Sequence, residues 1–336
     1  MIRLGINGFG RIGRAAFRRA LEMNDIEVVA INDISSASVL AHLLKYDSVF
    51  RTLSHEVSCE GECIVVDTKR IPVFAQKDPA AIPWHRAHVD VVLECSGRFT
   101  GLAEANAHLK GGAKAVVISA PSDTAPTYLM GVNHGEYQEE TVINNASCTT
   151  NSVAPLVAIL QEALSVQKAM MTTVHSMTAE QNVIDAVPPP LHLDLRRARA
   201  ASVNITPTTT GAAMATTKVL QGIDRLFDGI AIRVPTLDVS LTDLTAVVGK
   251  STTVSEVNDI FKQAAASTRW KGIVGVSEAP LVSSDFIGST YSAIVDLPMT
   301  RVVDGDLVKI MAWYDNEWGY AARLVELAED VGKKIK

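Results

Sequence analysis

The sequence has few cysteines, few aromatic residues and no excess of positive charge. Its 336 residues include four cysteines, and aromatic residues make up 5%. Cysteines this sparse and unevenly spaced exclude the disulfide framework of a small secreted domain. Cys59 and Cys63 have a spacing that sometimes accompanies metal sites, but no His/Cys cluster follows them. We therefore expect no metal.

Long apolar runs are also missing. No stretch is long enough to cross a bilayer, and residues 1–7 enter a predicted strand without the regions of a signal peptide. The net charge of -6 disfavours broad binding to nucleic acid or to an anionic membrane. We expect a cytoplasmic protein, and the chain length predicts two domains.

A glycine-rich turn follows the first predicted strand. Residues 2–7 alternate as a strand does, and residues 14–23 carry helical spacing. Gly8, Gly10 and Gly13 lie between them. The first glycine permits a tight turn, the second lets a pyrophosphate approach and the third lets the helix pack closely. This pattern predicts a dinucleotide-binding domain; an α/β turn with purely geometric glycines is the alternative.

A carboxylate follows the second predicted strand, residues 27–32. Asp33 lies twenty residues beyond Gly13, where an acidic side chain binds a ribose diol. The same charge would repel the 2′-phosphate of NADP, so we expect NAD. The hydroxyls of Ser35 and Ser36 leave use of both cofactors open.

Cys148 lies between a predicted strand end and the apolar run 153–160. Unpaired N–H groups and the positive end of a helix dipole lower the pKa of a thiol there, which favours the nucleophilic thiolate. His175 follows the strand-like run 169–174 and is the natural base for such a thiol. A packing cysteine and a hydrogen-bonded core histidine are the alternatives.

Two stretches in the second half suit anions. The turn-rich segment 186–210 contains arginines at 196, 197 and 199, and a threonine run leads to Gly211 and a predicted helix. Arg233 lies in an otherwise apolar strand, where an unpaired charge is costly. We expect a phosphorylated substrate; solvated loop arginines are the alternative.

Six motifs together resemble phosphorylating glyceraldehyde-3-phosphate dehydrogenase, in order and over essentially the whole chain. They are NGFGRIGR at 7–14, ASCTTN at 146–151, HSMT at 175–178, LRRARA at 195–200, RVPT at 233–236 and WYDNEWGY at 313–320. The resemblance implies an α/β fold: a Rossmann NAD-binding domain at 1–147, completed by a C-terminal helix at 317–336, and a mixed α/β catalytic domain at 148–316. It also implies a homotetramer, with the segment near 176–205 reaching a neighbouring subunit.

The resemblance further implies the reaction. Cys148 attacks the aldehyde of glyceraldehyde 3-phosphate and His175 accepts the proton. Hydride transfer to NAD leaves a thioester, which inorganic phosphate attacks to release 1,3-bisphosphoglycerate. Matching positions assign the substrate phosphate to Thr178 and Arg233. The attacking phosphate matches Ser147, Thr149, Arg197, Thr210 and Gly211. The cofactor matches Gly8, Gly10, Arg11, Ile12, Asp33, Lys77, Ser119 and Asn316, the last orienting the nicotinamide amide.

The sequence departs from the family pattern in three places. Ser152 replaces a second cysteine found in many relatives, so a disulfide with Cys148 is impossible and we expect activity to survive. Met177 replaces an aromatic residue, and the stretch at 186–190, with its prolines at 188–190, is longer than the family's loop. Subunit contacts and cofactor preference near that loop stay open.

Three other functions compete. Erythrose-4-phosphate dehydrogenase resembles the chain almost throughout, but it tends to lose the residues matching Thr178 and Gly211, which are present here. A noncatalytic NAD- or RNA-binding protein would not need Cys148, His175 and both anion stretches. Aspartate-semialdehyde dehydrogenase would not need paired phosphate sites.

Overall fold

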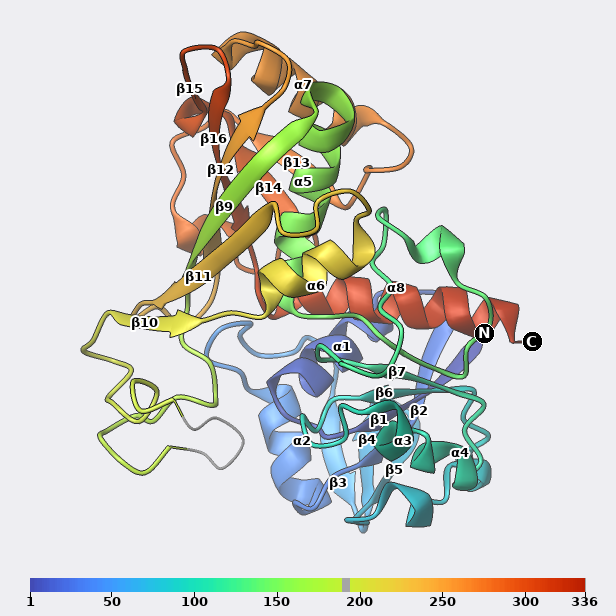
Figure 1. Cartoon of the computed structure of the whole chain (residues 1–336). Coiled ribbons are helices and arrows are strands. Elements are labelled where there is room, and N and C mark those ends of the chain that lie inside the picture. The colour runs from blue at the N-terminus through green and yellow to red at the C-terminus, as the bar shows by residue number, and fades with distance from the viewer. Residues whose placement is uncertain (189–193, 336) are drawn as a thin grey trace. The chain divides into compact units, whose positions relative to one another are not determined.

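The computed structural model describes residues 1–188 and 194–335. Pro189 and Pro190 of the predicted long loop, and Lys336 of the predicted C-terminal helix, lie outside the described residues. The chain divides into two compact units (Figure 1). Unit 1 contains Met1–Met130, His134–Ala146 and Ala321–Lys336, and unit 2 contains Gly131–Asn133 and Ser147–Tyr320.

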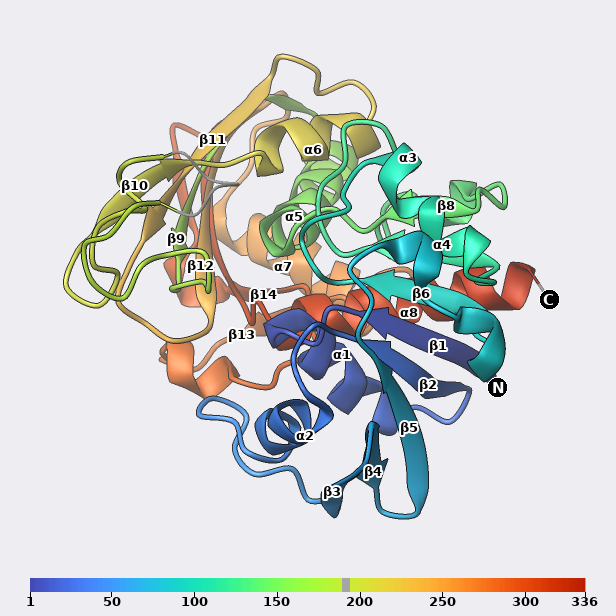
Figure 2. The same cartoon turned by 90° about the horizontal axis from the view of Figure 1, so that it is seen from below.

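Unit 1 is built on one twisted sheet, whose strands lie side by side in Figure 2. Eight strands from the described part of the chain follow the order β3-β4-β5-β2-β1-β6-β7-β8. They are β1 (Ile2–Asn7), β2 (Ile26–Asn32), β3 (Val57–Glu60), β4 (Cys63–Val66), β5 (Lys69–Phe74), β6 (Val91–Glu94), β7 (Ala115–Ile118) and β8 (Val142–Asn144). The pairs from β5 through β2, β1, β6 and β7 to β8 are parallel, whereas β3, β4 and β5 pair in antiparallel fashion. The strand order reverses between β1 and β6, which is where such sheets bind ligands.

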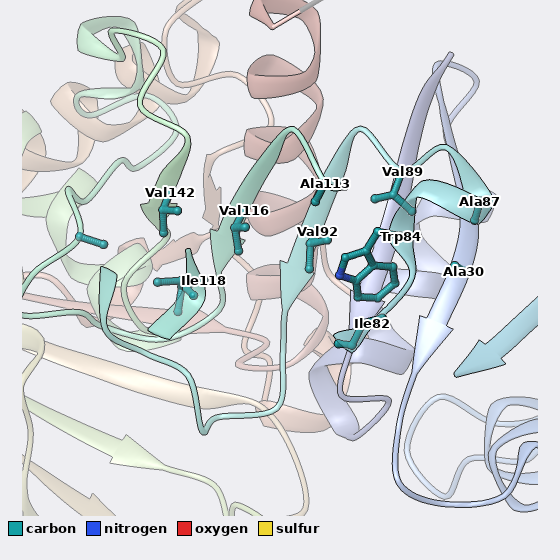
Figure 3. Close-up of a cluster of buried hydrophobic side chains, with 12 residues drawn as sticks. Ala30, Ile82, Trp84, Ala87, Val89, Val92, Ala113, Val116, Ile118 and Val142 are labelled. Carbon is teal, nitrogen blue, oxygen red and sulfur yellow. The ribbon is translucent and has the colours of Figure 1, made fainter. Parts of the chain in front are cut away.

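The core of unit 1 surrounds its central strands. All residues of β6 and β7 are buried, as expected for parallel strands covered on both faces. On one side Trp84 packs among Ile82, Val89 and Val92 (Figure 3). The helices of unit 1 are α1 (Arg11–Leu21), α2 (Ala37–Lys45), α3 (Leu102–Ala105), α4 (Ala107–Lys110) and, from Ala321 onward, α8 (Trp318–Lys334), with short 3-10 turns η1 (Pro79–Ala81), η2 (Trp84–Ala87) and η3 (His134–Glu136).

Unit 2 contains a second, mostly antiparallel sheet. Its described strands follow the order β10-β11-β9-β12-β16-β14-β13, and β15 pairs with β16. They are β9 (Val166–His175), β10 (Thr206–Thr209), β11 (Phe227–Arg233), β12 (Ser240–Val248), β13 (Val274–Ser277), β14 (Ala293–Asp296), β15 (Arg301–Val303) and β16 (Leu307–Tyr314). The helices are α5 (Cys148–Leu164), α6 (Ala212–Val219) and α7 (Val254–Ala266), with 3-10 turns η4 (Ser283–Phe286) and η5 (Leu297–Met299).

Helix α5 is the central helix of unit 2. It contacts β9, β12 and β14 of the sheet, and α6 and α7 pack against it. Its middle, residues 149–160, is almost entirely buried, and β12 alternates buried and half-buried side chains as a strand with one covered face does. Among the described residues, no helix is both long and apolar enough to span a bilayer.

Candidate active site

Cys148 is the first residue of α5. Ser147 precedes the helix with extended backbone angles, and its hydroxyl accepts the Thr150 N–H at 3.1 Å. This N-cap fixes the point at which the helix begins and leaves other first-turn N–H groups directed outward. Cys148 is half-buried, so part of it stays accessible to a reactant.

His175 lies beside Cys148. Its Nε2 is 3.5 Å from the Cys148 Sγ, although 27 residues separate the two in sequence. The other ring nitrogen, Nδ1, is 2.8 Å from the carbonyl oxygen of Ser176. Because a carbonyl only accepts, Nδ1 carries the proton and Nε2 directs its lone pair at the thiol. The structure thus brings the two predicted catalytic residues together with His175 in the tautomer of a base.

The protonation of this pair differs from the sequence-based expectation. Burial raises the pKa of the Cys148 thiol to about 11, although hydrogen bonds with Thr149 and the charge of Arg233 lower it. Burial and, secondly, the Arg233 charge lower the pKa of His175 to about 4. The expectation of a lowered thiol pKa at the helix end is therefore wrong, because the cost of burying a thiolate is the larger effect. Burial thus disfavours the charged form of both Cys148 and His175.

Tyr314 supports this pair from the end of β16. Its hydroxyl lies 3.1 Å from the Thr149 Oγ1 and 2.7 Å from the Thr173 Oγ1. Its ring packs edge-on to His175 with centroids 6.1 Å apart, and burial holds the pKa of its hydroxyl well above the usual value. Sequence reasoning did not assign it a role. The alternating burial along β16, which turns Tyr314 inward, is the signal that points to it.

The register of two neighbouring strands places Arg233 beside His175. Strands β9 and β11 are parallel neighbours, and Arg233 is the register partner of His175. The Arg233 Nη1 donates to the Thr178 hydroxyl at 2.6 Å, and Nε is 3.4 Å from the Thr208 hydroxyl. Arg233 is 8% exposed, and burial lowers its pKa. The predicted pair Thr178 and Arg233 is therefore assembled.

One carboxylate, which sequence reasoning missed, joins the two predicted anion stretches. The Glu180 Oε1 accepts from the Arg233 Nη2 at 2.9 Å and also from the Arg197 Nη1. Gln181 adds an acceptor, its Oε1 lying 3.3 Å from the Arg233 Nη1. The Arg233 charge, which we expected to need an anion, is therefore paired with a carboxylate of the chain itself. The sequence signal for Glu180 is a carboxylate close to arginines that are at least half-buried.

Thr210 and Gly211 lie at the start of α6. Gly211 precedes the helix, and open space surrounds the position of a Cβ there. The Thr210 hydroxyl accepts the Ala212 N–H at 3.2 Å. Within the described ranges neither residue forms a hydrogen bond with Ser147 or Arg197. The residues predicted to bind the attacking phosphate are therefore not all joined by direct contacts.

Asn316 has a fixed amide orientation. Its Oδ1 accepts hydrogen bonds from the Ser176 and Ser240 hydroxyls, both at 2.8 Å. The Ser240 Oγ in turn accepts the Ser176 N–H at 3.1 Å, so its own proton is directed at Asn316. Because the Asn316 carbonyl oxygen already accepts two hydrogen bonds, its NH₂ group is the part of the amide that can donate to a ligand.

The glycine loop of unit 1 matches its predicted geometry. Gly8 has φ +88 and a Cβ there would lie 2.5 Å from the Ser96 nitrogen, so only glycine makes this turn. At Gly13 a Cβ would lie 2.2 Å from the Gly8 carbonyl oxygen, whereas no atom lies within 4 Å of one at Gly10. The loop is closed at its two ends and open at its middle, as a pyrophosphate cradle requires.

The other predicted cofactor residues of unit 1 differ in their contacts and in their exposure. The Asp33 carboxylate accepts the Phe9 N–H at 2.8 Å and the Ser35 N–H at 2.9 Å, which holds it beside the loop. Arg11 begins α1 and forms an ion pair with Asp47. Further residues are half-buried Ile12, exposed Lys77, and half-buried Ser119 directly after β7. No cluster able to hold a metal ion occurs in the described part of the chain.

The chain also matches known proteins in sequence. Residues 2–102 match the family model "Glyceraldehyde 3-phosphate dehydrogenase, NAD binding domain", and residues 147–316 match "Glyceraldehyde 3-phosphate dehydrogenase, C-terminal domain". The chain is 52% identical over 331 residues to glyceraldehyde-3-phosphate dehydrogenase 1 of Bacillus cereus, with 98% of each chain covered. It is 51% identical over 336 residues to the glyceraldehyde-3-phosphate dehydrogenase of Geobacillus stearothermophilus, with 99% of each covered. A Kluyveromyces marxianus enzyme, glyceraldehyde-3-phosphate dehydrogenase 3, is 45% identical over 334 residues, with 99% of this chain and 100% of the relative covered.

Proposed function

The chain belongs to the glyceraldehyde-3-phosphate dehydrogenase family, with its NAD-dependent phosphorylating activity and its two-domain fold, and on that premise we propose which of its residues carry the reaction. The observation that carries the proposal is the distance of 3.5 Å between the Cys148 Sγ and the His175 Nε2. Near it, buried Arg233 and half-buried Arg197 supply positive charge for phosphate groups.

Cys148 is the nucleophile. As its sulfur bonds to the aldehyde carbon, its proton passes to the His175 Nε2, and the hemithioacetal forms on Cys148. Nδ1 stays bonded to the Ser176 carbonyl, which keeps the ring in place as the imidazolium forms. NAD, when bound, supplies the acceptor for the hydride that leaves the hemithioacetal carbon. The thioester left on Cys148 is then opened by inorganic phosphate, whose oxygen bonds to the carbonyl carbon as the C–S bond breaks. The sulfur leaves as the Cys148 thiolate and takes back the proton held on the His175 Nε2.

The anions are divided between two groups of residues. Thr178 and Arg233 hold the phosphate of glyceraldehyde 3-phosphate, supported by their 2.6 Å contact. The attacking phosphate is held by Ser147, Thr149, Arg197, Thr210 and Gly211. The first-turn N–H groups of α5 and the open start of α6 support this second assignment.

NAD is held mainly by the glycine loop. Gly8, Gly10 and Gly13 suit the pyrophosphate, because the middle glycine is open and the outer two allow no side chain. The Asp33 carboxylate binds the ribose hydroxyls, and the Asn316 NH₂ group orients the nicotinamide amide. Further contacts come from Arg11, Ile12, Lys77 and Ser119. Accordingly, residues 1–147 with the C-terminal helix 317–336 form the cofactor domain and 148–316 the catalytic domain, a division that the two compact units support.

We further propose that the protein is a cytoplasmic homotetramer. Several apolar side chains near 176–205 are uncovered in a single chain, which is costly in water and is relieved by contact with another copy. These are Val183, Ile184, Val187, Leu195, Val203 and Ile205, each 71–88% exposed. Sedimentation of the purified protein tests this, since a monomer at micromolar concentration would contradict it.

The reaction is tested by NADH formation from glyceraldehyde 3-phosphate with and without inorganic phosphate. Erythrose 4-phosphate and NADP serve as alternative substrate and cofactor. We expect phosphate-dependent oxidation of the triose with NAD. Preference for the tetrose would overturn glyceraldehyde 3-phosphate as the substrate and leave the fold and the Cys148–His175 pair in place.

A further inference from the structure

Glu180 lies where a phosphate would be expected. Its Oε1 alone accepts hydrogen bonds from both Arg233, at 2.9 Å, and Arg197. Phosphate oxygens bind guanidinium groups through these same N–H donors. The chain therefore supplies its own anion at the two arginines that the proposed function assigns to two different phosphates.

The chain uses four of the five N–H donors of the Arg233 guanidinium. Nε faces the Thr208 hydroxyl, Nη1 donates to Thr178 and Gln181, and Nη2 donates to Glu180. Of these four partners Glu180 alone is charged, and it is the strongest competitor for an incoming anion. A phosphate can take a two-pronged grip on the guanidinium only after one of these bonds is released.

The arginines need a counter-ion when no phosphate is bound. The Arg197 side chain is 11% exposed and that of Arg233 is 9% exposed, and each charge disfavours the other. Burying two like charges without an anion is costly. The Glu180 side chain is 30% exposed and has room to withdraw into water. Glu180 therefore satisfies the arginines before the ligand arrives and competes with the ligand when it does.

We propose that Glu180 is an exchangeable counter-ion that tunes phosphate affinity, occupying the arginines in the empty site and withdrawing when a phosphate binds. This inference rests on the proposed assignment of Arg197 and Arg233 to phosphate groups. A phosphate must break the contacts of Glu180 before it can bind the arginines. The free-energy cost of breaking them keeps the affinity for phosphate below the value that the arginines alone would give. Moderate affinity favours release of a phosphorylated product.

Binding of inorganic phosphate to the full-length NAD-saturated protein tests the proposal. Glu180→Gln keeps the size and an acceptor but removes the charge. Two unit charges about 4 Å apart in a water-like medium interact by about 1 kcal/mol, which is about fivefold in affinity. We expect Glu180→Gln to bind phosphate at least about fivefold more tightly in calorimetric titration, and KM for phosphate to fall with it.

Asp185→Asn is the matched control. Asp185 lies in the same segment and carries the same charge, but it pairs with exposed Arg199. We expect it to change phosphate affinity by less than twofold. Equal or weaker phosphate binding in Glu180→Gln overturns the proposal, because Glu180 would then hold the arginines in place. So does an equal gain in Asp185→Asn, which would reveal a general charge effect.

A second measurement does not depend on the variant folding. In a crystal structure of the wild type with bound phosphate, Glu180 should have left at least one of the two guanidinium groups; both ion pairs intact beside a phosphate on Arg233 would overturn the proposal. Neither measurement needs turnover. Failure to oxidise the triose would refute the proposed function and leave the role of Glu180 to be decided by binding.

Discussion

Replacing Asp238 with asparagine should stabilise the protein, and the gain should grow with pH. Asp238 is 4% exposed, and within the described residues neither of its carboxylate oxygens has a hydrogen bond of ordinary geometry; burial raises its pKa by more than the Val239 N–H lowers it. Its neighbour Asp315 accepts backbone N–H groups from Gly288, Glu317 and Trp318. Burial raises the pKa of Asp315 to about 6, and these bonds hold it below that of Asp238, so Asp315 is the first of the two to ionise. Burial, then the charge of Asp315, raises the pKa of Asp238 to about 9, so Asp238 stays protonated.

The size of the gain follows from linkage. The folded-state pKa lies above the unfolded value, so Asp238 contributes fully to stability at low pH and loses that contribution as pH rises from about 4 towards 9. The loss is about 1.4 kcal/mol per pH unit, at most about 4 kcal/mol at pH 7. An asparagine is neutral at every pH and its NH₂ donates to Asp315. Allowing for an imperfect fit of the amide, we expect a gain of about 2 kcal/mol at pH 8, or about 3 °C in Tm for a chain of 336 residues.

Thermal unfolding at pH 5, 6.5 and 8 measures this, with the wild type beside Asp238→Asn. Asp224→Asn is the control, since Asp224 is exposed and the charge change is the same. The Tm difference for Asp238→Asn should be smallest at pH 5 and largest at pH 8, while the control stays flat. A variant no more stable than the wild type at pH 8, or a difference independent of pH, would refute the protonated Asp238.

Four further predictions concern the reaction and the cofactor. Cys148→Ser should abolish NADH formation while NAD binding changes less than about twofold in a fluorescence titration; retained turnover would show that the nucleophile is misassigned. His175→Asn should slow the first turnover of NADH in stopped flow by about 10²–10⁴-fold, because an amide cannot accept the thiol proton, and a loss under tenfold would contradict its role as base. Asp33→Gly should relax discrimination against NADP, whereas an unchanged ratio of kcat/KM for the two cofactors would place specificity elsewhere. Gly13→Ala, with a carbonyl oxygen 2.2 Å from its new Cβ, should lower Tm, while Gly10→Ala, with no atom within 4 Å, should leave Tm unchanged and weaken NAD binding alone; equal Tm values would show that the loop adapts.

Much of the cofactor loop was predictable because its geometry is local. Gly8 and Gly10 lie between β1 and α1, and Gly13 lies in the first turn of α1, so their spacing in the sequence sets their spacing in the structure. The start of α5 at Cys148 is local in the same way, through its Ser147 cap. The motifs also identified the family, the fold and NAD, and the comparisons confirm all three.

The protonation of the site was not predictable in this way. The start of a helix can be predicted from the sequence, and on that basis we expected a lowered pKa for the Cys148 thiol. Burial depends on how many other segments pack around the sulfur, and here it reverses the direction of the shift.

The amino-acid sequence alone determined which residues of each motif stand together, because neighbours along the chain are held by covalent bonds and by local helix and turn geometry. Folding decided which motifs meet. His175 and Arg233 are brought side by side by the hydrogen-bonded register of β9 and β11, and the Tyr314 hydroxyl reaches Thr149 from the end of β16. Glu180 becomes a counter-ion in the same way, because packing places buried Arg233 and half-buried Arg197 beside its carboxylate. Such contacts depend on strand pairing and burial over the whole unit, and no short stretch of sequence contains them.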